Sequence, residues 1–176
     1  MAHDVAKGLQ VVGNPADLEI AYYTVATTDE VWIGDLLIED AGVSGVVDIY
    51  TTGGTAYTAG VSLGHAVGVG TTIEVPVCID PRAKYQIQVS TDQDIAATDV
   101  FSFFSVIMAA DPSSDQDFSN MELDVQAAGA TDPLVVLGIA KGPAPNGGSY
   151  ATFGAAHAQA IVKIRPTRMI TAGAEA

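Results

Sequence analysis

The sequence predicts an all-β fold, either a barrel or a sandwich, preceded by an extended N-terminal arm. Short segments rich in valine, isoleucine, tyrosine and threonine recur at intervals of about 10 residues, and glycine, proline, aspartate or asparagine bounds each one. No stretch holds an apolar period of about 3.6 residues with caps at both ends, so long helices are not expected. A length of 176 residues makes one domain the default.

The expected elements follow one another along the chain. Residues 1–17 contain Gly8, Gly13 and Pro15 and show no periodicity, which indicates the extended arm. Residues 18–166 are expected to form the single β-domain, and residues 167–176 a C-terminal tail. Ten strands are expected, over residues 18–26, 31–39, 43–50, 55–63, 72–79, 84–90, 100–109, 121–126, 134–140 and 158–165.

Two of these segments differ in how apolar and polar residues are distributed between the two faces of the strand. In residues 84–90, Tyr85, Ile87 and Val89 alternate with polar residues, which is typical of a strand with one buried face. In residues 158–165 the apolar residues do not alternate cleanly, which is typical of a strand buried on both faces.

The chain is acidic and sparsely charged. Its net charge is −14 at pH 7, and only 16% of its residues are charged, which is below the usual quarter. Nucleic-acid backbones and anionic membranes would repel it, so neither is expected as a direct partner. So little charge indicates either a large core or surfaces that meet other proteins.

The ends and the single cysteine add little about the compartment. Cys78 lies in an apolar, strand-like segment and is expected in the core, and one cysteine allows no disulfide within the chain. The first residues lack an apolar core, so no signal peptide is expected.

One motif resembles a nucleophile site. Residues 60–64 match Gly-x-Ser-x-Gly around Ser62, and His65 follows. That chemistry needs the serine on a tight turn from a strand into a helix, whereas a strand is expected next here. A hydrolase using Ser62 and His157 is therefore the least favoured function, and we expect no enzyme and no catalytic residue.

Metal and cofactor sites also lack sequence support. The three histidines are far apart, and no Cys-x-x-Cys or His-x-x-x-His spacing occurs. The best candidate is an oxygen-rich stretch that lacks the glycine and terminal glutamate of a calcium loop. A solvated acidic loop is expected instead, with calcium as the alternative, over Asp111, Asp115, Asp117, Asn120, Glu122 and Asp124.

Aromatic residues form two groups in the sequence. Phe101 and Phe103 are expected to share one face of a strand and to lie in the core. A second group offers a flat platform for a carbohydrate- or cell-surface-binding β-sandwich, which is the alternative function. This group consists of Tyr22, Tyr23, Trp32 and Tyr57.

Short motifs also follow one another in a characteristic order over residues 20–165. This order resembles a family of tailed-phage capsid cement proteins, also called decoration proteins. The motifs are Gly34-Asp35-Leu36-Leu37, Gly45-Val46-Val47, Asp80-Pro81-x-x-x-Tyr85-x-Ile87-Gln88-Val89, Ile95-Ala96-Ala97-Thr98-Asp99-Val100, Met121-Glu122-Leu123-Asp124, Pro133-Leu134-Val135-Val136-Leu137-Gly138, Asn146 and Ile161-Val162-Lys163-Ile164.

The resemblance implies a β-barrel or β-tulip domain on the outer surface of an icosahedral capsid, made in the cytoplasm of the bacterial host. Such a protein has no active site and no cofactor, and it clamps neighbouring capsomers. Its partners are the major capsid protein and further copies of itself, with a homotrimer favoured over a dimer. The expected contacts with the shell or a neighbour are apolar in the arm, at Leu9, Val11 and Val12, and basic near the end of the chain, at Lys163, Arg165 and Arg168. On this interpretation the arm serves shell binding, and the β-domain folds without it.

Overall fold

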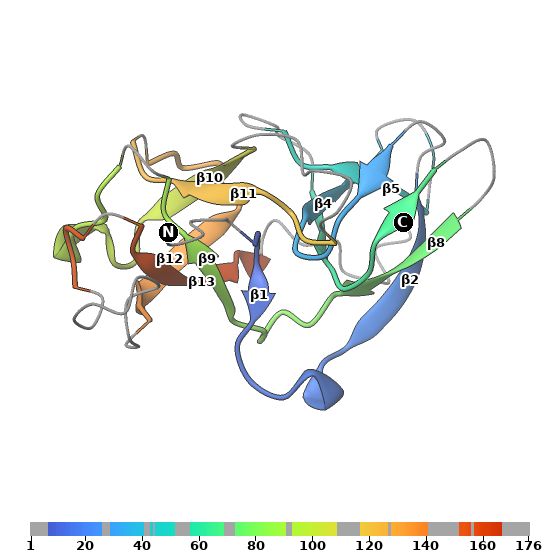
Figure 1. Ribbon diagram of the computed structural model, residues 1–176, viewed down its shortest axis with the longest axis horizontal. Coiled ribbons are helices and arrows are strands. Elements are labelled where there is room, and N and C mark those ends of the chain that lie inside the picture. Colours follow the sequence, from blue (N-terminus) through green and yellow to red (C-terminus); the bar gives the residue numbers. More distant parts are fainter. Residues whose placement is uncertain are drawn as a thin grey trace.

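The computed structural model describes residues 7–25, 29–40, 43, 45–51, 57–68, 73–90, 93–108, 117–126, 128–140, 152–155 and 157–166. Its regular structure is almost entirely β-strand, which confirms the predicted fold class. The strands form two units that lie side by side along the longest axis of the molecule (Figure 1). Among the described residues, no helix has the length and apolar content needed to cross a membrane.

The first unit is a closed barrel of five strands. Its interior holds small and branched side chains, among them Val25, Leu37, Val47, Val75 and Val77, as expected for alternating strands that line a narrow barrel. In order around the barrel, the strands are β2 (Ile20–Val25), β5 (Val46–Ile49), β4 (Leu36–Glu39), β6 (Thr58–Ser62) and β8 (Ile73–Cys78). Neighbours are antiparallel, except that β2 and β5 meet in parallel.

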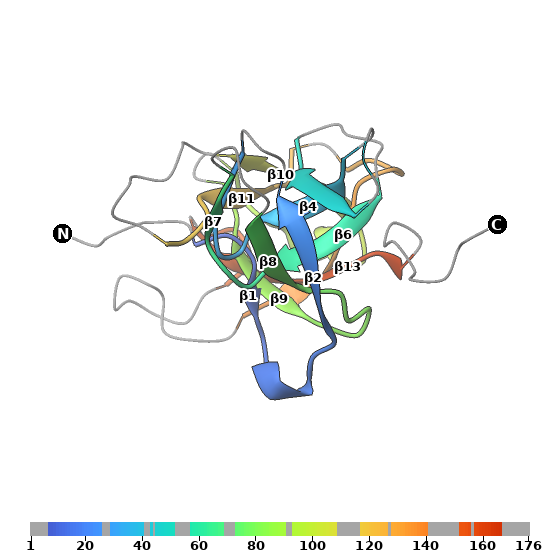
Figure 2. The same ribbon diagram turned by 90° about the vertical axis from the view of Figure 1, so that its right-hand side faces the viewer.

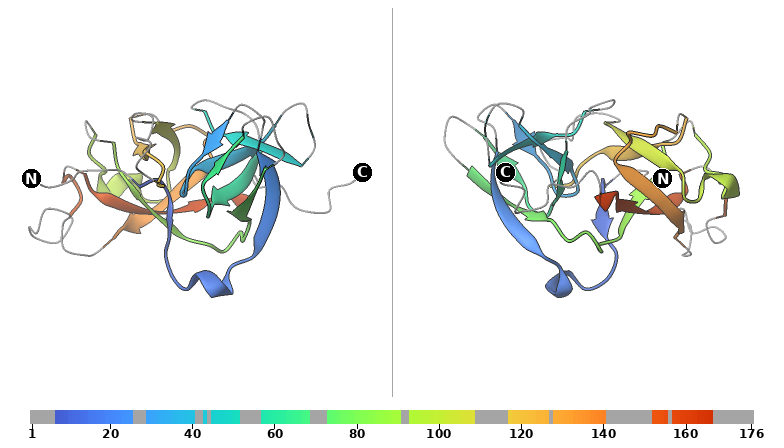
Figure 3. Two further views of the ribbon diagram at one scale, coloured as in Figure 1. Left: turned by 45° about the vertical axis from the view of Figure 1, so that its right-hand side comes forward. Right: turned by 180° about the vertical axis from the view of Figure 1, so that it is seen from behind.

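The second unit is a six-stranded antiparallel sheet. In order, its strands are β1 (Gln10–Val11), β9 (Tyr85–Gln88), β13 (Gln159–Ile164), β12 (Leu134–Ile139), β10 (Phe103–Met108) and β11 (Met121–Asp124). The sheet curls, so that Val89 just after β9 bridges to Leu123 in β11. Figure 3 shows this curl from two sides.

Four short elements complete the regular structure of the described residues. Strands β3 (Glu30–Val31) and β7 (Ala66–Val67) pair with each other next to the barrel. Two single turns of 3-10 helix, η1 (Pro15–Asp17) and η2 (Ala97–Asp99), lie outside the sheets.

One hydrophobic core joins the two units. Leu36, Val61 and Cys78 are cross-strand neighbours on the outer face of the barrel, and each is fully buried. They pack into the same cluster as Tyr85, Ile87 and the other inner residues of the curled sheet. Burial of Cys78 confirms its expected core position.

The ten predicted segments each contain an observed strand, with two differences in detail. The segment over residues 31–39 is broken, because the chain turns between β3 and β4, where Asp35 N donates to Trp32 O at 3.1 Å. Strands β1 and β7 were not predicted, because two residues are too few to show a period.

Candidate functional site

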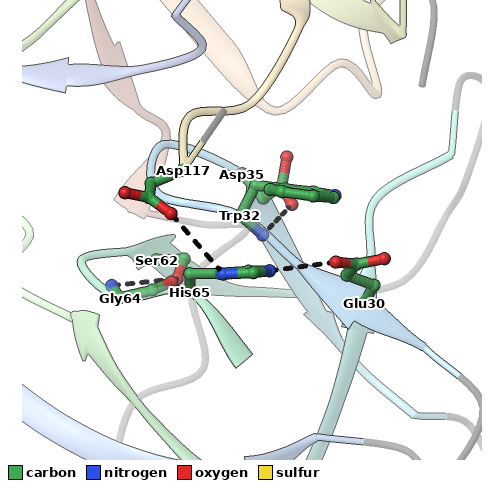
Figure 4. A network of polar contacts seen from close by, with 7 residues as sticks. All are labelled: Glu30, Trp32, Asp35, Ser62, Gly64, His65 and Asp117. Atoms are coloured by element: carbon green, nitrogen blue, oxygen red, sulfur yellow. Dashed lines mark hydrogen bonds and ion pairs between the residues drawn. The ribbon is translucent and has the colours of Figure 1, made fainter. Parts of the chain in front are cut away.

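A cluster of polar side chains lies where the barrel meets the curled sheet (Figure 4). Its base is the turn after β3. The Asp35 carboxylate accepts the Trp32 N–H at 2.7 Å, and this closes the turn with a side chain as well as with the backbone.

Close packing of glycine holds this turn against the N-terminal segment. Gly34 has φ +94°, and a Cβ there would lie 2.7 Å from Lys7 O. Its carbonyl accepts the Leu9 N–H at 2.9 Å. Only glycine fits this position without strain, because both the backbone angle and the available space exclude a side chain.

The segment before β11 reaches the same turn from the other unit. Ile33 N donates to Asp117 O at 3.0 Å, and Ser119 N donates to Ile33 O at 2.9 Å. The Ser119 hydroxyl hydrogen-bonds to the Asp35 carboxylate and also accepts the Met121 N–H at 3.0 Å. The turn is thus bound to segments that are far apart in sequence.

Asp35 is a fully buried carboxyl group at the centre of this junction, with 0% of its surface exposed. Burial raises its pKa from 3.8 to about 6, because the charged form loses its hydration. Hydrogen bonds from Ser119 and Trp32 and the nearby His65 oppose this rise only in part. The group therefore changes charge under mildly acidic conditions.

His65 lies between two carboxylates and against an aromatic ring. Its Nε2 is 3.0 Å from Glu30 Oε1, and its Nδ1 is 3.9 Å from Asp117 Oδ1. Its ring stacks on the indole of Trp32 with centroids 4.3 Å apart. Glu30 and Asp117 thus each approach one nitrogen of the same imidazole, so the three side chains link β3 and the segment before β11 to the segment before β7.

The predicted nucleophile motif has no nucleophile geometry. Ser62 is fully buried in β6, and its hydroxyl donates to Gly64 O at 2.7 Å. The chain continues into β7 rather than a helix. His157 precedes β13 of the curled sheet, whereas Ser62 belongs to the barrel.

The acidic stretch is only partly described, since Asp111 and Asp115 lie outside the described residues. Within the described part, Glu122 accepts from Gln88 Nε2 at 2.9 Å, and Asp124 accepts from Gln93 Nε2 at 2.9 Å. Among the described residues, no group of three or more His, Cys, Asp or Glu is placed to hold a metal ion.

Two aromatic residues differ in burial from what the sequence predicts. Phe101 is 73% exposed and not in the core, because the chain turns there with φ +69° and β10 begins only at Phe103. Trp32 is 6% exposed, and one face of its ring is covered by His65. It is therefore not part of an exposed platform with Tyr22, and the remaining rings offer less to a sugar than the sequence suggested.

The predicted apolar contacts of the arm are not equivalent. Leu9 is buried in the core, with 2% exposed, so it is not available to a neighbour in this fold. Val11 pairs with Tyr85 in the curled sheet and packs on the core. Val12 is 43% exposed. Residues 10–11 are thus part of the sheet, and the apolar side chain of Val11 packs beside β9.

The three basic residues predicted to contact the shell or a neighbour also differ from one another. Arg165 lies 3.8 Å over the Phe103 ring and donates to Ala130 O at 2.6 Å, so its charge serves a contact within the chain. Lys163 is half-buried on β13 opposite Val135. Arg168 lies outside the described residues.

Comparison of the chain with known protein families, with curated proteins and with solved structures gives no match.

Proposed function

We propose that this chain is a non-enzymatic structural protein that binds the outer surface of a tailed-phage capsid and clamps neighbouring capsomers. The observation that carries the proposal is the presence of exposed apolar side chains at both ends of an elongated β-scaffold. A clamp needs contact sites that are well separated and rigidly connected.

The first contact site is on the barrel. Ile20 and Tyr22, on the outer face of β2, are 43% and 67% exposed. The second is at the far end of the curled sheet, where Phe101 and Phe153 are 73% and 39% exposed. A hydrogen bond from Gly154 N to Ile95 O fixes the segment of Phe153 beside the segment that leads to η2.

These two sites lie at opposite ends of the molecule, because β2 and the η2 segment are at the two extremes of its long axis (Figure 1). The shared core keeps their separation fixed. Two weak contacts made at once bind far more strongly than either alone when the scaffold matches the spacing of the sites. Further copies of the chain, in a trimer or dimer, would multiply this effect.

Sequence features support the same proposal. The motif order over residues 20–165 resembles the capsid cement family, and only 16% of all residues are charged. Surfaces that bury against other proteins are depleted in charge.

Quantitative mass spectrometry of purified virions tests the proposal, by comparing copies of this chain with copies of the major capsid protein. We expect a ratio near one chain for each shell subunit. A few copies in each particle would indicate a tail or vertex component, and absence from the particle would overturn the proposal.

A binding experiment with shells that lack the protein then tests the two contact sites. The purified chain should cosediment with such shells. Tyr22→Ser and Phe101→Ser should each weaken binding by about tenfold or more, because each removes one anchor of a two-point contact. Lys84→Ala, an exposed change between the two sites, is the matched control and should bind like the unaltered chain.

A further inference from the structure

Strand β2 is paired along only one side for most of its length. It pairs with β8 through all its residues, from Ile20 opposite Cys78 to Val25 opposite Ile73. On its other side it meets β5 only at Thr24 and Val25. Residues 20–23 therefore form a sheet edge beyond the short contact that closes the barrel.

Two hydrogen bonds show which backbone groups face outward from this edge. Ile79 N donates to Glu19 O at 2.9 Å, and Thr24 N donates to Gly45 O at 3.3 Å. Alternate residues of an antiparallel strand direct both N–H and C=O to the same side. The backbone groups of Ile20 and Tyr22 therefore point away from β8, like those of Thr24, and they have no ladder partner among the residues that the structure describes.

The side chains of this edge favour a protein partner. Ile20 and Tyr22 lie on the outer face of β2, which is turned toward the viewer in Figure 2, and both are exposed. An accessible strand edge with apolar side chains is a template for an added strand, unless charges or proline protect it. Neither lysine nor proline lies in β2.

The charge around the edge defines the kind of partner. Glu19 and Glu74 are exposed beside it, and Glu74 lies opposite Thr24. Burial and then the Glu39 carboxylate raise the pKa of the neighbouring Tyr23 phenol. Residues 18–79 contain no lysine or arginine and eight acids, which are Glu19, Asp29, Glu30, Asp35, Glu39, Asp40, Asp48 and Glu74.

Arg82 does not neutralise this negative charge. Arg82 is close enough to Glu19 to interact with it, but its guanidinium forms two hydrogen bonds, both of 3.1 Å, with the Asp80 carboxylate. The β2 edge therefore has a negative potential, which attracts cationic segments and repels anionic ones.

We propose that the edge of β2 at Ile20 and Tyr22 binds an extended, basic segment of a partner protein, which adds as a strand to the barrel. Backbone hydrogen bonds supply the affinity, alternate apolar side chains pack on Tyr22, and lysine or arginine residues pair with Glu19, Glu39 and Glu74. This inference goes beyond the proposed function, because it does not depend on the partner being a capsid.

Two synthetic peptides serve as probes, Lys-Thr-Val-Thr-Val-Thr-Lys and Glu-Thr-Val-Thr-Val-Thr-Glu. Each is titrated into the full chain, labelled with nitrogen-15, at low salt, and the backbone amides are followed by NMR. We expect the lysine peptide to shift and protect the amides of Ile20 and Tyr22, and to bind about tenfold or more tightly than the glutamate peptide.

Two variants test the mechanism. Tyr22→Pro removes an outward N–H that β8 does not use, and it should abolish binding. The double variant Glu19→Lys and Glu39→Lys keeps every backbone group and should reverse the preference, so that the glutamate peptide binds more tightly. Met108→Ala, an exposed apolar residue on β10 of the other unit, is the control and should change neither result.

Three outcomes would each overturn the proposal. They are equal binding of the two peptides, NMR shifts centred away from residues 20–24, and an unchanged peptide preference in the charge-reversed variant. The charge-reversed variant remains informative if Tyr22→Pro fails to fold. None of these results depends on the virion measurement, so the two proposals succeed or fail separately.

Discussion

The indole of Trp32 lies flat on the imidazole of His65, with ring centroids 4.3 Å apart and planes inclined by 10°. Trp32 is the one tryptophan of the chain, so its emission reports directly on the junction between the two units. The contact joins the segment before β7 to the turn after β3, next to the buried Asp35.

Removal of the His65 ring should shift the emission of Trp32 to longer wavelength. The imidazole covers one face of the indole, and only 6% of Trp32 is exposed, so His65→Ala opens that face to water. Fluorescence spectra of the variant and the unaltered chain at pH 8 check this. His157→Ala is the control and should leave the emission maximum unchanged. An unchanged maximum in His65→Ala would mean that the imidazole does not shield the indole from water.

The Asp35 carboxyl should make the protein more stable under mildly acidic conditions. Its pKa is about 6 in the folded chain and 3.8 as a free side chain, so the folded state binds the proton more tightly. The free energy of unfolding from this group therefore falls as pH rises from about 4 to about 6, by about 3 kcal/mol, and is constant above that range.

Asp35→Asn should remove most of this dependence and raise stability at pH 8, as measured by urea unfolding at pH 5 and pH 8. Some slope should remain, because burial and the neighbouring Asp29 also raise the pKa of Asp48. If the Asp35→Asn variant kept the same pH dependence as the unaltered chain, the carboxyl would not be the source.

Gly34→Ala should destabilise the junction. It places a Cβ 2.7 Å from Lys7 O at φ +94°, so it adds a steric clash to backbone strain, and we expect a loss of about 2–4 kcal/mol. Gly45→Ala is the matched control, because Gly45 has φ +79° with nothing within 4 Å. Its loss should be about 1 kcal/mol. Equal losses, measured by urea unfolding, would mean that close packing at the turn contributes nothing.

Leu9→Ala should destabilise the whole fold by about 2–4 kcal/mol, because it leaves a cavity in the core. Val12→Ala, at a position that is 43% exposed, should cost less than about 1 kcal/mol. Thermal unfolding of both variants checks the difference. A small effect at Leu9 would instead favour an arm that the β-domain does not need for folding.

Local sequence patterns were sufficient for the fold class and for ten strands. Alternation of apolar and polar residues, as at Tyr85, Ile87 and Val89, depends only on near neighbours along the chain. Turn residues mark the ends of such segments in the same local way. The all-β architecture could therefore be predicted from the sequence without knowing which strands pair.

The junction was not predictable, because tertiary contacts assemble it. Asp35 and Ser119 meet only when the segment before β11 reaches the barrel, and no spacing in the sequence records that approach. Arg165 looked like a free surface charge, but it lies over Phe103 and binds a backbone carbonyl. Phe101 is exposed rather than buried because its own φ is positive. The sequence pattern of the strand does not reveal this backbone conformation.

The shared core has a consequence for how the protein comes apart. Leu36, Val61 and Cys78 are outer residues of the barrel, yet they are covered by side chains of the curled sheet. A barrel excised by cutting the connection between β8 and β9 would expose this apolar face to water and invite aggregation. The two units should therefore melt together as one cooperative transition, and fragments of the chain should regain their shape only when both are mixed in the same solution.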